Sequence, residues 1–111
     1  MAKQGESESF GMMVRKLRMS KGWTVKEFIE RLSRAGQRVS PAYITRIEQY
    51  NEIPAPALIL RIADVFDIDA PDLFRLASMT KTMKLIENLE RKYREAEGLY
   101  RDRQDRKRST D

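Results

Sequence analysis

Apolar side chains recur at helical spacing along most of this chain, and this periodicity limits the possible folds more than any other feature. The first such segment begins near Ser9, and four more follow, separated by glycine or proline. The first apolar stripe consists of Phe10, Met13, Val14 and Leu17, at positions i, i+3, i+4 and i+7. No segment keeps the two-residue alternation of a half-buried strand. We therefore predict an all-α fold in which five short helices, each with one apolar stripe, close around a single core.

The ends of the first two helices carry specific signals. Gly22 is a stop for the first helix, because glycine commonly follows a helix end. Thr24 is followed three residues later by Glu27, and together they form a capping box at the start of the second helix. That helix is expected at about residues 25–34. Gly36 suits the left-handed conformation that often follows a helix end.

The stretch VSPAYITRIEQYNEIP, residues 39–54, predicts a third helix at about Pro41 to Tyr50. Ser40 suits the N-cap and proline suits the first helical position. The side chains expected to face the interior are Tyr43, Ile44, Ile47 and Tyr50. Those on the opposite side are Ala42, Thr45, Arg46 and Gln49. This outer row is short and polar with one long cation, so it is the candidate surface for a partner.

The rest of the chain divides into two more short helices and a long arm. The prolines of the loop after residue 50 forbid helix continuation, and Pro56 suits the first turn of a fourth helix. Asp69 and Pro71 begin a short fifth helix that reaches Ala77. We predict a flexible N-terminus at 1–8, a helical domain at 9–79 and a charged helical arm at 80–111. The arm is expected to fray after Tyr100, where no apolar residue follows.

Composition narrows the classes of function. The net charge of +5 favours anionic partners. The sequence has no histidine and no cysteine, which removes the commonest general base, the commonest metal ligand and thiolate chemistry. We therefore expect no enzyme, no metal and no cofactor. No run approaches the roughly 18 apolar residues of a membrane span, and the N-terminus lacks the apolar core of a signal peptide. A cytoplasmic protein without membrane association is expected.

Three segments in order carry a resemblance to a known family. They read RKLRMSKGWT, VSPAYITRIEQYNEIP and LILRIADVFDIDAPDLF. Together they resemble the lambda-repressor and Cro-like (XRE-type) helix-turn-helix DNA-binding domains, over roughly residues 10–77. The resemblance implies a compact five-helix DNA-binding domain, followed in this chain by a long C-terminal helix.

The resemblance also implies a role for the third helix, whose N-terminal half would enter the DNA major groove. The residues expected to read bases are Ala42, Thr45, Arg46 and Gln49. Arginine can pair with guanine O6 and N7, and alanine can pack on a thymine methyl group. The expected DNA backbone contacts come from the backbone N–H groups after Thr24, and from Arg34, Arg38 and Asn51.

Two further features follow from the resemblance. Arg18 is expected to pair with Glu48 and tie the recognition helix to the scaffold. The connector between the second and third helices is several residues longer than in the family, and Pro41 stands where a polar reader is common. The missing polar reader at this position predicts low intrinsic specificity, or specificity taken from DNA shape.

The arm carries a possible coiled-coil seam. The residues at heptad positions a and d are Ile86, Leu89, Tyr93, Ala96 and Tyr100, flanked at e and g by Glu90, Lys92 and Glu97. We expect a homodimer formed through this helix; a helix folded back on its own domain is the alternative.

The function expected from these observations is a sequence-specific, DNA-binding transcriptional regulator, most simply a repressor that occupies double-stranded DNA as a dimer. The alternative is a protein–protein interaction module, or an antitoxin-like protein that binds a partner through the same fold, without strong base reading. The two differ in salt dependence, because phosphate contacts release counterions and protein contacts do not.

Overall fold

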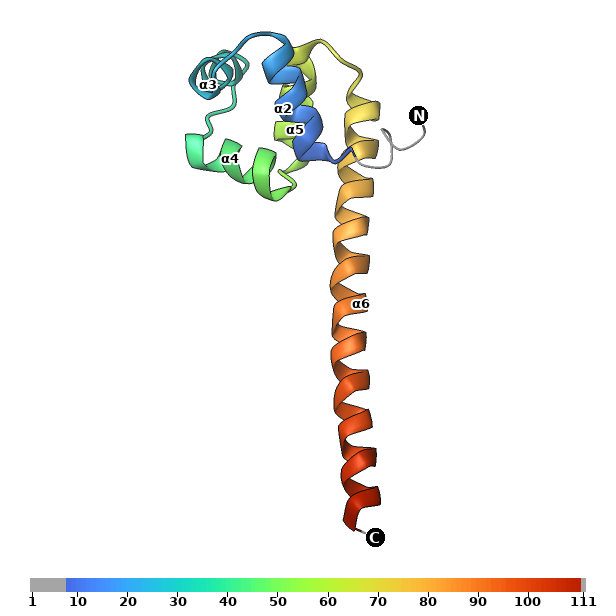
Figure 1. Cartoon of the computed structure of the whole chain (residues 1–111). Helices are drawn as coiled ribbons and strands as arrows, with labels where there is room; N and C mark the ends of the chain where they lie inside the picture. Colours follow the sequence, from blue (N-terminus) through green and yellow to red (C-terminus); the bar gives the residue numbers. More distant parts are fainter. Residues whose placement is uncertain (1–7, 111) are drawn as a thin grey trace. The chain divides into compact units, whose positions relative to one another are not determined.

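A computed structural model describes the fold of residues 8–110 and the side chains up to Gln104. The flexible N-terminus predicted at 1–8 lies outside the described residues, apart from Glu8. Within that range the structure has five helices and no strand (Figure 1). They are α2 (Phe10–Ser20), α3 (Val25–Arg34), α4 (Pro41–Tyr50), α5 (Pro56–Phe66) and α6 (Ala70–Thr110). The predicted all-α class is confirmed, as are the predicted bounds of α3 and α4.

Side-chain caps account for the starts of three of these helices. The hydroxyl of Ser9 accepts the Met12 N–H at the start of α2. At the start of α3, the Thr24 N–H donates to the Glu27 carboxylate at 2.8 Å and the Thr24 hydroxyl accepts the Glu27 N–H at 3.1 Å. This confirms the predicted capping box. Ser40 caps α4 in the same way, with Pro41 in the first turn.

The connector between α3 and α4 is closed by a left-handed turn. Gly36 has a φ of 96°, which an L side chain rarely adopts. The Gln37 N–H donates to the Leu32 carbonyl at 2.9 Å, and the Gly36 N–H donates to the Ser33 carbonyl. This pair of bonds is a Schellman motif. The longer connector therefore begins with a defined helix end, and half-buried Val39 packs against the core at its other end.

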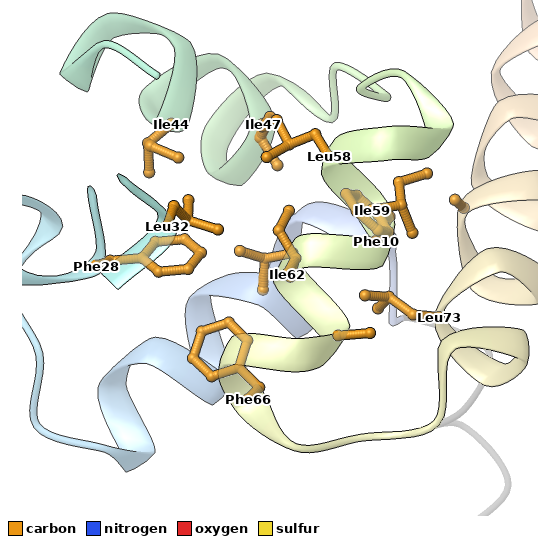
Figure 2. Packing of buried hydrophobic residues seen from close by; sticks show 13 residues of the cluster. Phe10, Phe28, Leu32, Ile44, Ile47, Leu58, Ile59, Ile62, Phe66 and Leu73 are labelled. Atoms are coloured by element: carbon orange, nitrogen blue, oxygen red, sulfur yellow. The ribbon is translucent and has the colours of Figure 1, made fainter. Parts of the chain in front are cut away.

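Every helix contributes side chains to one apolar core. Figure 2 shows Phe10 of α2, Phe28 of α3, Ile47 of α4, Ile62 of α5 and Leu73 of α6 converging. All five are at most 2% exposed. Because α4 contributes Ile44 and Ile47 to this cluster, its opposite face must point away from the core.

The prediction that Tyr50 of α4 faces the core is wrong. Tyr50, which the spacing placed inside, is 70% exposed. The buried face of α4 is made instead by Ile44, Ile47 and Glu48, and it rotates away from Tyr50 before the helix ends at that residue. A search for apolar residues at helical spacing passes over a glutamate. It therefore selected Tyr50 for the buried face and left Glu48 out.

The fifth helix and the arm form one continuous helix, α6. The sequence predicted a short helix to Ala77 and an arm from residue 80, but no proline follows Pro71 and no glycine occurs before Gly98 to end the helix. The chain forms two compact units, which divide between Lys81 and Thr82. α6 ends at Thr110, and the expected fraying of its last turns stays a prediction.

Thr80 belongs to the core of the first unit. Its side chain is buried, and its hydroxyl accepts the Phe10 N–H at 2.9 Å and donates to the Leu76 carbonyl at 2.9 Å. The bond from Phe10 satisfies an N–H of the first turn of α2, which has no partner within its own helix. The first unit therefore includes Thr80, one residue beyond the predicted domain boundary.

Candidate DNA-binding surface

The outer row of α4 lies on one face of the helix. Its members, Ala42, Thr45, Arg46 and Gln49, are spaced i, i+3, i+4 and i+7. Thr45 is half-buried and the other three are exposed. The inner face of the same helix is buried against the core. α4 thus presents a continuous row of small and polar side chains, ending in amide and guanidinium groups, that is accessible from outside.

A close helix crossing holds α4 against α2. A Cβ atom at Gly11 would lie 2.1 Å from the Ile47 carbonyl oxygen and 3.1 Å from the Glu48 carbonyl oxygen. The two backbones therefore meet at a residue that has no side chain. The Gly11 N–H also donates to the Asn51 carboxamide at 3.2 Å. Sequence reasoning missed this contact; its one signal was a glycine inside the first turn of a helix.

The structure brings Arg18 and Glu48 together across the same crossing. Arg18 Nε lies 2.8 Å from Glu48 Oε2 and Arg18 Nη2 lies 3.0 Å from Oε1, which makes the pair bidentate. Arg18 Nη1 also donates to the Trp23 carbonyl at 2.8 Å. The Glu48 side chain is 4% exposed and that of Arg18 is 14% exposed. The hydrogen bond to Glu48 raises the pKa of Arg18 above its usual value, against the opposing effect of burial.

A second cluster joins two residues of α4 to a residue of the loop that follows the helix. Arg46 Nε lies 2.9 Å from Glu52 Oε1, and the guanidinium carbon sits 5.2 Å from the centre of the Tyr43 ring. Burial raises the pKa of Tyr43, the charge of Glu52 adds to this rise, and Arg46 opposes it. The phenol therefore stays neutral at physiological pH and keeps its O–H donor. Neither Glu52 nor this cluster was anticipated from the sequence.

The residues predicted to contact the DNA backbone lie around α3 and α4. Thr24, Arg34 and Arg38 are exposed. The capping box occupies the hydroxyl and the N–H of Thr24, so the first-turn N–H groups that can meet a phosphate are those of Val25 and Lys26. Asn51 differs from the other three, because its side-chain oxygen already joins α4 to α2.

Comparison with protein-family models matches residues 14–73 to the helix-turn-helix family, over more than half of the chain. The chain belongs to this family, the lambda-repressor-like helix-turn-helix proteins. The resemblance is thereby confirmed, and the chain carries a helix-turn-helix domain of a family of DNA-binding regulators. Comparison with curated proteins and with solved structures found no match.

The helical arm, considered by itself, exposes its apolar residues. Ile86, Leu89, Tyr93, Ala96 and Tyr100 all carry exposed side chains. Ion pairs within the helix surround them: Arg94 lies 3.8 Å from Glu90, and Arg101 lies 3.4 Å from Glu97. Among the helices of residues 8–110, none is both long enough and apolar enough to cross a membrane.

Proposed function

We propose that this helix-turn-helix protein is a sequence-specific transcriptional repressor that uses α4 as its recognition helix. The observation that carries the proposal is the division of α4 into a buried face, tied to α2 through Glu48 and Gly11, and an exposed row that ends in Arg46 and Gln49. A helix held rigidly on one side can present its other side to base edges with a defined register. Repression then requires only that the bound protein exclude other proteins from the operator.

The chemistry of the exposed row supports different contacts at different positions. Arg46 can donate two hydrogen bonds to guanine O6 and N7. Thr45 offers a hydroxyl or a methyl group, Ala42 can pack on a thymine methyl, and Gln49 can pair with adenine N6 and N7. Only two of these four side chains are long donors. The short row and Pro41 therefore favour modest base specificity, supplemented by DNA shape.

The phosphate contacts we propose come from two places. The N-terminus of α3 offers the N–H groups of Val25 and Lys26 together with the positive end of the helix dipole. Arg34 and Arg38 flank the connector and are both exposed. Since these contacts recognise no sequence, they would position α4 in the groove rather than select the operator.

The first test is the substitution Arg46→Ala. We expect operator binding to weaken by about 1 to 3 kcal/mol, with base preference relaxed at one position, because a bidentate arginine–guanine pair is lost. The melting temperature should stay near that of the wild type, since Arg46 is about half exposed. Titrations against the operator and against single-base variants of it would measure both effects.

The control for that test is Arg61→Ala. Arg61 is also an exposed arginine in an ion pair, 3.0 Å from Asp64, but it lies on α5. The substitution Arg61→Ala removes the same charge as Arg46→Ala and leaves the exposed row of α4 unchanged. Equal losses of affinity from both substitutions, with base preference unchanged, would contradict the assignment of Arg46 as a reader.

We further propose that the arm joins two copies as a parallel coiled coil. The heptad places Ile86 at a and Leu89 at d, a combination that favours parallel dimers. In a parallel pair, Lys92 at g faces Glu97 at e of the other copy, an attractive contact on both sides of the seam. An antiparallel pair would instead bring the acidic e positions of the two copies, Glu90 and Glu97, together. A parallel arm joins both DNA-binding units at the same end, as two half-sites require.

Leu89→Asp in the full chain tests the dimer. We expect the variant to sediment as a monomer where the wild type sediments as a dimer, because a carboxylate buried at a d position carries a large desolvation penalty. Asn88→Asp introduces the same charge one residue away, off the seam, and should leave the dimer intact. A wild-type chain that is monomeric at all accessible concentrations would refute the proposal.

Selection of bound sequences from a random DNA pool at physiological salt tests the function as a whole. An inverted repeat enriched by the wild type and lost with Leu89→Asp would support a dimeric operator-binding protein. Absence of enrichment, together with affinity that barely changes with salt, would favour the alternative of a protein-interaction module.

A further inference from the structure

We infer that Glu52 is a specificity-determining residue, which holds Arg46 in the orientation that reads guanine and at the same time weakens binding to other DNA. The inference rests on the proposed role of Arg46 as a base reader. It assigns a function in DNA recognition to an acidic residue that does not itself contact a base.

The backbone brings Glu52 back over the end of α4. Asn51 has a φ of 55°, a left-handed conformation, and its N–H donates to the Arg46 carbonyl. The Glu52 N–H donates to the same carbonyl at 3.0 Å. The Asn51 side chain is in turn anchored by the Gly11 N–H. Two backbone hydrogen bonds and one side-chain hydrogen bond hold this turn. They place the Glu52 side chain beside Arg46.

The guanidinium of Arg46 is restrained on two sides. Its Nε is 2.9 Å from Glu52 Oε1, and its guanidinium carbon lies over the ring of Tyr43, 5.2 Å from the centre. Among the described residues, these contacts leave the Nη1 and Nη2 end of the fork for a ligand. That end can donate two parallel hydrogen bonds to guanine O6 and N7. A long, flexible side chain is thereby oriented before DNA arrives, which lowers the entropy lost on binding.

Stability does not explain this pair. The side chains of Arg46 and Glu52 are 51% and 42% exposed, and exposed ion pairs contribute little to folding. A carboxylate beside the recognition helix also repels phosphates, so it weakens sequence-independent binding, which depends on charge. At a guanine, the two hydrogen bonds that Arg46 donates offset this repulsion of the phosphates. The combined effect is greater discrimination, a form of specificity that uses a repulsive element.

The test compares Glu52→Gln with the wild type in full-length chains. The measured quantity is the ratio of affinities for the selected operator and for the same site with the guanine opposite Arg46 replaced. We expect this ratio to fall by about twofold to fivefold, the range that exposed ion pairs reach, while affinity for random DNA rises. Asp64→Asn is the matched control, because it removes one carboxylate from an exposed arginine pair on α5. It should leave the ratio unchanged.

A double-mutant cycle ties the effect to Arg46. In the Arg46→Ala background, Glu52→Gln should no longer change the ratio, because the group it orients is absent. An unchanged ratio for Glu52→Gln alone, with the wild-type operator motif intact, would overturn the role of Glu52 and leave the proposed function standing. A wild type that selects no motif would overturn both, so the two failures are distinguishable.

Discussion

Gly11→Ala is expected to lower the free energy of unfolding by about 3 kcal/mol or more, at or above the upper end of the usual overpacking range. The new Cβ would lie 2.1 Å from the Ile47 carbonyl oxygen, far inside van der Waals contact. That oxygen is backbone, so it cannot move as the end of a flexible side chain could. The helices α2 and α4 would have to separate, which would also break the bond from the Gly11 N–H to Asn51. Denaturant unfolding monitored by circular dichroism measures the loss.

A second glycine in the chain offers the matched control. Gly98 lies in α6, and nothing comes within 4 Å of a Cβ placed there. Gly98→Ala should therefore stabilise the arm slightly, by up to about 1 kcal/mol, through helix propensity alone. If Gly11→Ala changed stability as little as Gly98→Ala, the close crossing of α2 and α4 would be contradicted. Because the crossing seats α4, Gly11→Ala should also weaken DNA binding in the molecules that still fold.

Glu48→Ala is expected to destabilise the fold by about 2 to 3 kcal/mol, somewhat below the full effect of breaking a buried ion pair because Arg18 keeps some contact with water. The substitution removes both carboxylate oxygens from a guanidinium whose side chain is only 14% exposed. It also opens space between α2 and α4. Thermal unfolding would show a lower melting temperature than that of the wild type.

The control for Glu48→Ala is Glu90→Ala. Glu90 pairs with Arg94 at 3.8 Å on the surface of the arm, where both side chains are largely exposed. An exposed pair of this kind contributes at most about 1 kcal/mol. A melting temperature that moved equally little in both variants would show that the Arg18–Glu48 pair does not hold α4 in place.

Local signals were sufficient for the helix ends. The capping box at Thr24, the Ser40–Pro41 start and the left-handed Gly36 each depend on residues within a few positions of one another. Such contacts form the same way in any surrounding fold, so they can be deduced from the sequence. The outward orientation of Arg46 could also be deduced, because helical spacing alone separates it from the stripe of Ile44 and Ile47.

Contacts between segments distant in the chain could not be deduced in this way. The close approach at Gly11 joins α2 to α4, and the hydrogen bond from the Phe10 N–H to Thr80 joins α2 to α6. Tyr50 is exposed, contrary to the prediction, for the same reason: the partner of a helix face determines which side chains that face buries. In the case of Glu48 the partner is an arginine, Arg18, and only the family resemblance suggested it.

The sequence by itself determined the all-α class, the bounds of α3 and α4 and the row of side chains that α4 turns outward, because these depend on spacing and on local capping. Only the tertiary structure decided how closely α2 and α4 approach, how far the first unit extends into α6, and that Glu52 returns to Arg46 through the left-handed turn at Asn51. These features depend on where separate backbones meet and on what each side chain finds there. The spacing of residues along the chain does not determine where two backbones meet or which groups a side chain contacts there.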